Sequence, residues 1–132
     1  TRVAMRGERY ADGTPIRRAI EEGLVDPARV VQVGIRGTLF SADELDWALG
    51  RGVTIVTIDE FHDRGVAETI ALSLRALGTG PTYLTLDIDV LDPAFAPGTG
   101  GLEPGGMTVR ELQVLVRGLG ALDLVGADIT GG

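Results

Sequence analysis

Four short apolar runs alternate along the chain with segments of helical periodicity, and this alternation limits the folds that the chain can adopt. The runs are rich in Val, Ile and Leu with little polar alternation, which is typical of strands covered on both faces. They lie at residues 29–35, 53–58, 82–88 and 122–129. Helical patterns lie at 14–22, 41–49, 63–77 and 108–119. The order predicts right-handed crossovers and an α/β fold with a mainly parallel sheet and helices on both faces.

Composition narrows the class of protein and of ligand. A length of 132 residues predicts a single α/β domain spanning 1–132. The formal net charge of −7 argues against nucleic acid or an anionic membrane as a partner and fits a cationic ligand. No apolar stretch approaches the roughly 18 residues of a membrane span, and no signal-peptide pattern opens the chain, so we expect a soluble cytoplasmic protein. Because the chain has no cysteine and one histidine, any metal should be held mainly by oxygen atoms.

The segment from residue 91 to residue 107 is the one long irregular stretch. It contains Pro93, Pro97 and Pro104 among clusters of glycine, so it cannot form a helix or a central strand. A loop of this length in a compact domain is usually functional or disordered, and the ordered pattern on either side favours a functional loop. Asp92, which precedes a proline, is interpreted as a turn residue.

Asp87 and Asp89 stand where the third apolar run ends. Ligands of open parallel sheets gather at the carboxyl ends of the strands, and residues two apart on a strand point the same way. Both carboxylates can therefore converge on one cation, which would remove the repulsion between them. The alternative is that these aspartates only cap a turn. The Asp-x-Asp pattern by itself leaves both interpretations open.

The longer string around these aspartates carries a family resemblance. "YLTLDIDVLDPAFAPGTG" at 83–100 resembles the signature of the ureohydrolases, the arginase and agmatinase family of manganese-dependent amidinohydrolases. "GIR" at 34–36, "GGMTVRELQVLVRGL" at 105–119 and "LVGADI" at 124–129 resemble further segments of that family, in the same order. Within the family the agmatinases look most similar.

The resemblance implies a three-layer α/β/α fold, of which this chain would be half, and a binuclear Mn²⁺ site. It further implies that a metal-bridging hydroxide attacks the guanidinium carbon of a cationic substrate such as agmatine and releases urea and an amine. By position, Asp87 and Asp89 match two aspartates of the family's third metal-ligand motif.

The chain also departs from the family pattern, which implies that it is the carboxyl-terminal half only. The family's Gly-Gly-Asp-His and Asp-Ala-His-x-Asp segments, which supply both histidine ligands, have no counterpart here. Asp12 takes the place of a histidine near the substrate, and Gly131 takes that of a glutamate that holds the guanidinium. Asp12 and Glu103 are the predicted substrate contacts. No catalytic residue is assigned, and His62 is interpreted as a surface or helix-entry residue.

Two hypotheses follow, and they leave open whether this chain is an enzyme. It is either a fragment of a manganese-dependent, agmatinase-like amidinohydrolase, inactive alone, or a non-catalytic α/β scaffold that retains the loop motif for assembly. Half of a sheet would expose an apolar edge and face, so we expect a homo-oligomer or association with a complementary chain. For Arg36 a structural role, such as pairing with a carboxylate at the sheet edge, is favoured over one at the substrate entrance. For Trp47 packing in the core or at a subunit contact is favoured over ligand stacking.

Overall fold

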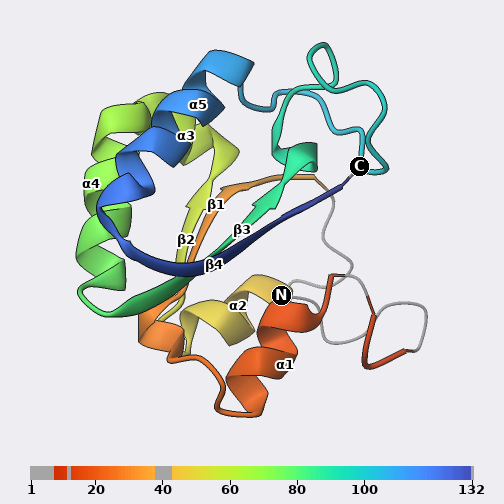
Figure 1. The fold of residues 1–132 in the computed structure, drawn as a ribbon. Coiled ribbons are helices and arrows are strands. Elements are labelled where there is room, and N and C mark those ends of the chain that lie inside the picture. The colour runs from red at the N-terminus through yellow and green to blue at the C-terminus, as the bar shows by residue number, and fades with distance from the viewer. Residues whose placement is uncertain (1–7, 12, 38–42, 132) are drawn as a thin grey trace.

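The fold of the computed structural model follows the predicted alternation of helices and strands (Figure 1). The structure describes residues 8–11, 13–37 and 43–131. Its elements in chain order are α1 (Pro15–Glu21), η1 (Pro27–Arg29), β1 (Val31–Ile35), α2 (Asp43–Leu49), β2 (Thr54–Thr57), α3 (Ile58–Arg64), α4 (Val66–Leu77), β3 (Pro81–Asp87), η2 (Ile88–Val90), α5 (Val109–Gly118), η3 (Leu119–Ala121) and β4 (Asp123–Thr130).

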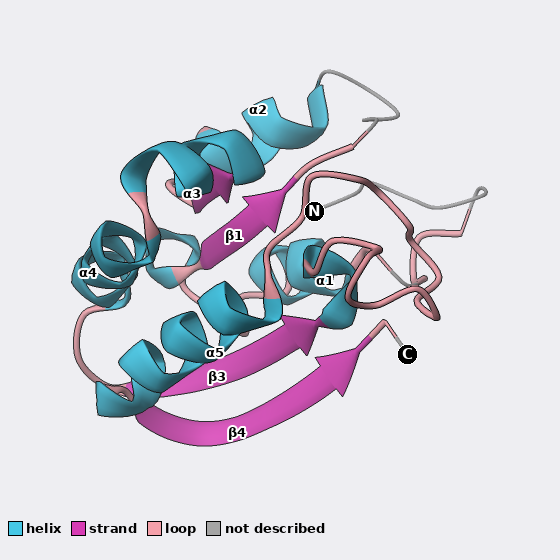
Figure 2. Ribbon diagram, turned by 90° about the horizontal axis from the view of Figure 1, so that it is seen from above, coloured by secondary structure: helices cyan, strands magenta, loops and turns pink. Residues whose placement is uncertain are grey.

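The four strands of the described ranges pair in parallel, but as two separate pairs. β1 pairs with β2, and β3 pairs with β4. Within the described ranges the two pairs form separate two-stranded sheets, where the sequence predicted one mainly parallel sheet. Figure 2 shows β1, β3 and β4 running in the same general direction, so their carboxyl ends face the same end of the molecule. That shared end is where a ligand site of an α/β fold is expected.

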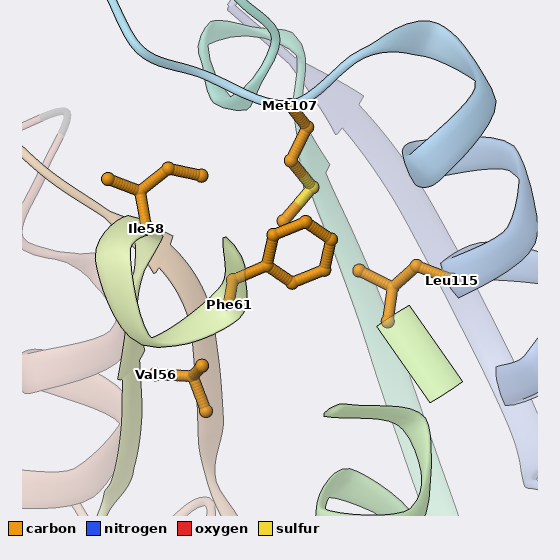
Figure 3. Packing of buried hydrophobic residues seen from close by; sticks show 5 residues of the cluster. All are labelled: Val56, Ile58, Phe61, Met107 and Leu115. Atoms are coloured by element: carbon orange, nitrogen blue, oxygen red, sulfur yellow. The ribbon is translucent and has the colours of Figure 1, made fainter. Parts of the chain in front are cut away.

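Two apolar clusters place helices on both faces of the β1–β2 sheet, which gives the three layers. The first cluster is centred on Val56 and Phe61 and includes side chains of α3, α4 and α5. In Figure 3 the Phe61 ring lies between Met107 above and Val56 below, with Leu115 of α5 beside it. Packing of this kind supplies most of the stability of such short helices, because isolated helices of their length are marginal in water.

The second cluster lies on the opposite face of β1–β2 and holds α1 and α2 there. Ile20, Ala48 and Val53 form its buried centre, and Ile55 packs against it. Ile55 and Val56 are neighbours in β2 and point to opposite faces, so each belongs to a different cluster. Trp47 also packs here, with the guanidinium carbons of two arginines each 4.1 Å from its ring centre. Core packing of Trp47 is thereby confirmed.

The predicted helix at 63–77 is wrong in its first turns. Two helices stand there, α3 and α4, separated at Gly65, whose φ of +80° suits glycine. The strand before them ends at Thr57, whose side chain accepts the Glu60 N–H while Glu60 bonds back to the Thr57 N–H. This capping box starts α3 directly after β2. The predicted cap of α5 is confirmed, since Thr108 and Glu111 form a second capping box.

The β3–β4 sheet is less covered than β1–β2. Along β3 the exposed residues Tyr83, Thr85 and Asp87 alternate with half-buried ones. On β4, Val125 and Ile129 are 65% and 69% exposed. This uncovered apolar surface is the kind that proteins bury against a partner or another part of a chain. No helix among the described residues is long and apolar enough to span a membrane.

Candidate metal and substrate site

Asp87 and Asp89 are brought together by a turn and not by strand alternation. β3 ends at Asp87, and Asp89 lies in the 3-10 turn η2 that follows. The Asp89 N–H donates to Asp87 Oδ1 over 3.0 Å, which fixes the turn immediately after the strand. This hydrogen bond sets the position of Asp89 beside Asp87, since the period of a strand does not extend through the turn. Convergence of the two carboxylates on one cation stays a prediction.

Gly131, just after β4, lies next to an oxygen atom of each of the two carboxylates. A Cβ atom on Gly131 would contact Asp87 Oδ1 and would lie 3.2 Å from Asp89 Oδ1. Gly131 follows Thr130, which is the register partner of Asp87, so β4 delivers it to this place. Asp89 Oδ1 is buried and has no hydrogen-bond partner in the described structure. A buried carboxylate oxygen without a partner is costly, and a cation would relieve that cost.

The two aspartates fit part of a metal site. Their oxygens suit Mn²⁺ and other hard divalent ions. Within the described ranges, however, no group of three or more His, Cys, Asp or Glu residues is arranged to hold a metal. A complete coordination shell would therefore need ligands from outside those ranges. Metal binding by Asp87 and Asp89 stays a prediction.

The loop after the aspartates closes on itself through Asp92. Its Oδ1 accepts the Ala94 N–H over 2.9 Å, which confirms the predicted turn role, and its Oδ2 accepts the Gly105 N–H over 2.8 Å. The N–H groups of Ala94 and Gly105 donate to the ionised carboxylate and hold the pKa of Asp92 below its ordinary value. Two backbone hydrogen bonds, from Asp92 N to Met107 O and from Met107 N to Val90 O, each 2.9 Å, join the two ends of the loop. We call this junction of residues 90–92 with residues 106–107 the neck of the loop. Residues 92–105 thus form a pinned loop above the aspartates.

The two predicted substrate contacts have different outcomes. Asp12 lies outside the described residues. Glu103 is exposed at the loop surface, and a Cβ atom on Gly37 would lie 3.1 Å from its Oε2. Gly37 is one of the residues lining a pocket of about 270 Å³ at the carboxyl ends of β1 and β2, together with Ile35, Arg36, Leu45, Thr57, Ile58 and Asp59. The structure places Glu103 beside this pocket, and its substrate contact stays a prediction.

Arg36 follows β1 and has a structural role, but its partners are backbone carbonyl oxygens and not the carboxylate that the sequence suggested. Its guanidinium donates to the carbonyl oxygens of Asp89 and Leu91 over 2.6 and 3.1 Å. It also donates to the carbonyl oxygen of Glu103 over 2.8 Å. Arg36 therefore joins the β1 end of the molecule to the loop that follows β3.

His62 contacts the same loop, which sequence reasoning missed. It lies inside α3, and its Nε2 is 3.3 Å from the Gly105 carbonyl oxygen. Its Nδ1 is 3.8 Å from Glu111 Oε1 of α5. The pKa of Glu111 is lowered chiefly because the Thr108 N–H donates to its carboxylate. No local pattern around His62 indicates a partner 43 residues away.

A polar group on the exposed face of β3–β4 was also missed. Thr85 Oγ1 donates to Asp128 Oδ1 over 2.7 Å, and these residues are register partners. A hydrogen bond from Tyr83 to Asp128 raises the pKa of the tyrosine. The group lies on the strand face that leads to Asp87. The signal available in the sequence was the position of Asp128 near the end of the fourth apolar run, matching Asp87 in the third.

Comparison with known proteins agrees with this fold. The arginase family profile, "Arginase: Arginase family", matches residues 1–131. The guanidinopropionase of Pseudomonas aeruginosa is 57% identical over 120 residues, which are 91% of this chain and 38% of that protein. The proclavaminate amidinohydrolase of Streptomyces clavuligerus is 50% identical over 129 residues, which are 98% of this chain and 41% of that protein. The chain belongs to the arginase family.

Solved structures share the fold. That of the Streptomyces clavuligerus amidinohydrolase gives a TM-score of 0.91 over 98% of this chain and 43% of that one. The Trypanosoma cruzi formiminoglutamase with Mn²⁺ gives 0.85 at 19% identity, over 98% of this chain and 44% of that one, a likeness of fold alone. The chain thus spans about two fifths of the length of the relatives it matches.

The predicted nearness to agmatinases is not established. Several agmatinases match at 38% to 45% identity, below the guanidinopropionase and the proclavaminate amidinohydrolase. These comparisons establish the arginase family, but they do not distinguish which guanidino compound is the substrate.

Proposed function

We propose that this chain is part of an amidinohydrolase that hydrolyses a guanidino compound to urea and an amine. In that reaction water adds an oxygen to the guanidinium carbon, the bond from this carbon to the substituted nitrogen breaks, and the nitrogen leaves protonated. The observation that carries the proposal is the buried Asp89 Oδ1, which has no hydrogen-bond partner among the described residues and lies, like Asp87 Oδ1, next to Gly131. Membership of the arginase family supports the class of reaction.

Asp87 and Asp89 would contribute oxygen ligands to a manganese site shared with residues outside the described ranges. When bound, paired divalent ions lower the pKa of a water molecule and so supply a nucleophile at neutral pH. The described residues hold the two carboxylates in place. Asp87 accepts the Asp89 N–H, and Arg36 binds the Asp89 carbonyl. The pinned loop of residues 92–105 limits access of water from its side, because Gly101 packs directly against Asp89 Oδ2.

For the substrate, a guanidino acid is the first candidate and agmatine the second. The guanidino acid is supported by the higher identity to guanidinopropionase, and agmatine by the resemblance of the residue 83–100 segment to agmatinases. Urea release by the complete protein that contains this segment, measured with 3-guanidinopropionate, 4-guanidinobutyrate and agmatine, separates them. A preference for agmatine would overturn the first choice.

The second candidate function is a non-catalytic scaffold. One observation favours it: within the described ranges, no group of three or more His, Cys, Asp or Glu residues is arranged to hold a metal. Under this alternative, the loop motif serves backbone geometry alone and Asp89 Oδ1 remains without a ligand.

A manganese titration of the 132-residue chain decides between the two functions. We expect Mn²⁺ to bind weakly, with a dissociation constant of about 10⁻⁴ to 10⁻³ M as in oxygen sites with few charged ligands. Asp89→Asn should abolish this binding. Asp123→Asn is the matched control, because Asp123 begins β4 at the opposite end and is exposed. Electron paramagnetic resonance of free Mn²⁺ measures both variants. Binding that survives Asp89→Asn, or no binding at millimolar Mn²⁺, contradicts the metal-site proposal.

A further inference from the structure

Arg36 connects two parts of the molecule that share no strand pairing among the described residues. It stands directly after β1, whereas the groups it binds follow β3. Its Nη2 donates to the carbonyl oxygens of Asp89, Leu91 and Glu103 over 2.6, 3.1 and 2.8 Å. Its Nε also donates to Glu103 O over 3.1 Å, and its Nη1 lies 3.4 Å from Val90 O. One side chain therefore binds the backbone on both sides of the loop.

The chemistry of the guanidinium explains why an arginine stands there. It carries five N–H donors in a rigid fork and keeps its charge at all physiological pH values, so it can serve several carbonyl oxygens at once. Hydrogen bonds from a charged donor are also stronger than neutral ones. A lysine has one compact ammonium group and could not reach the same set of oxygens in the same geometry.

The bonds of Arg36 act on the backbone that carries Asp89. The Asp89 N–H is held by Asp87 Oδ1, and the Asp89 carbonyl is held by Arg36. The Asp89 carboxylate in turn packs against Gly101, inside the loop whose far side Arg36 binds at Glu103. Without the hydrogen bonds of Arg36, the turn that carries Asp89 and the loop at Glu103 would each lose a fixed contact.

We propose that Arg36 is the positioning residue of this site, which holds the Asp89 turn and the 92–105 loop in the arrangement that presents Asp89 beside Asp87. The effect on metal affinity rests on the function proposed above, whereas the effect on the loop does not. The hydrogen bonds of Arg36 described above all go to backbone carbonyl oxygens, so it acts through the backbone and is not a metal ligand.

Hydrogen exchange and manganese affinity together test the proposal on the 132-residue chain. The variants are Arg36→Lys, which keeps the charge, and Arg36→Gln, which keeps a planar donor. The matched control is Arg29→Lys, because Arg29 Nε also donates to a backbone carbonyl, that of Leu77 over 2.7 Å, at the other end of the molecule. Urea unfolding of each variant gives the global stability against which local exchange is compared.

We expect both Arg36 variants to speed exchange of the Gly105 and Met107 amides about tenfold or more relative to the core amides, as loss of bonds from a charged donor predicts. Mn²⁺ affinity should fall by about the same factor, since a misplaced ligand no longer meets the ion. Arg29→Lys should leave the loop exchange relative to the core and the Mn²⁺ affinity within about twofold, because Arg29 binds the Leu77 carbonyl far from the loop.

The outcomes separate the two proposals. Unchanged exchange of Gly105 and Met107 in both Arg36 variants overturns the positioning role. Faster exchange that is uniform across the molecule, and is matched by Arg29→Lys, also overturns it, because Arg36 would then be merely structural. Faster loop exchange with no Mn²⁺ binding by the unmodified chain supports the positioning role and contradicts the metal site.

Discussion

At the scale of single residues, Gly106 shows how closely the backbone is packed at the neck of the loop. A Cβ atom there would contact the backbone of three residues at once, namely the Val90 oxygen, the Leu91 carbonyl carbon and the Asp92 nitrogen. Backbone atoms cannot move aside as the end of a flexible side chain can. The absence of a side chain at position 106 is therefore a condition for the loop to close below Asp92.

We predict that Gly106→Ala lowers the free energy of unfolding by about 1 to 3 kcal/mol, the usual cost of overpacking. Gly98→Ala is the matched control, because Gly98 lies in the same loop and has no atom within 4 Å of an added Cβ. The control should change stability by no more than about 0.5 kcal/mol. Urea unfolding followed by circular dichroism measures both. Equal stabilities of the two variants would show that the neck is looser than described.

At the scale of elements, the loop of residues 92–105 depends on an ionised Asp92. Its carboxylate accepts N–H groups from both ends of the loop, Ala94 near its start and Gly105 at its close. α5, which follows, begins with its own capping box at Thr108. Met107 lies between the closed loop and the capped start of α5, and both keep it in the buried cluster beside Phe61.

Loop closure should therefore weaken in acid. The folded-state pKa of Asp92 lies below its ordinary value of 3.8, so the stabilisation is complete above that pH and is lost as the pH falls through the lowered pKa. We expect the Gly105 amide resonance in nuclear magnetic resonance spectra to titrate below pH 3.8. Asp92→Asn should remove this titration, whereas Asp123→Asn should leave it. A Gly105 titration midpoint above 3.8 would contradict the assigned cause.

At the scale of the whole molecule, the two sheets differ in how well they are covered. β1–β2 has an apolar cluster on each face, whereas β4 exposes Val125 and Ile129. A sheet with a bare edge and exposed apolar side chains is prone to pair with another chain. This difference is the physical ground for the predicted association with copies or with a complementary chain.

We predict that the chain self-associates through β4. Val125→Lys should weaken this association about tenfold, because burying the lysine charge in the contact would cost about 1.4 kcal/mol of association free energy. Leu24→Lys is the control. Leu24 is 72% exposed, against 65% for Val125, but lies after α1 and far from β4 in sequence. Sedimentation velocity over a range of concentrations measures both. A chain that stays monomeric throughout, or equal effects of the two substitutions, would argue against β4 as the contact.

Most of the helices and strands could be predicted from the sequence, because each is indicated by residues close together in the chain. The apolar runs predicted β1 to β4 within a few residues, and Thr108 with Glu111 predicted the start of α5. Thr57 and Glu60 have the same capping spacing, which predicts the start of α3 at residue 58. The helix was instead predicted to start at residue 63, because the apolar periodicity lies within residues 63–77. For Asp87 and Asp89, the sequence predicted side chains that share one face of a strand, whereas a turn carries Asp89 in the structure.

The order of strands and helices, the family resemblance and the pair of carboxylates follow from the sequence, because periodicity, caps and motifs lie in neighbouring residues. The pairing of the described strands two and two, the bonds of Arg36 to carbonyl oxygens after β3 and the contact of His62 with Gly105 follow only from the folded chain. Each of these depends on groups dozens of residues apart, which are brought together by burial of apolar faces. Because the hydrophobic effect is non-directional, the local apolar pattern shows which residues become buried but not which distant segments pack against one another.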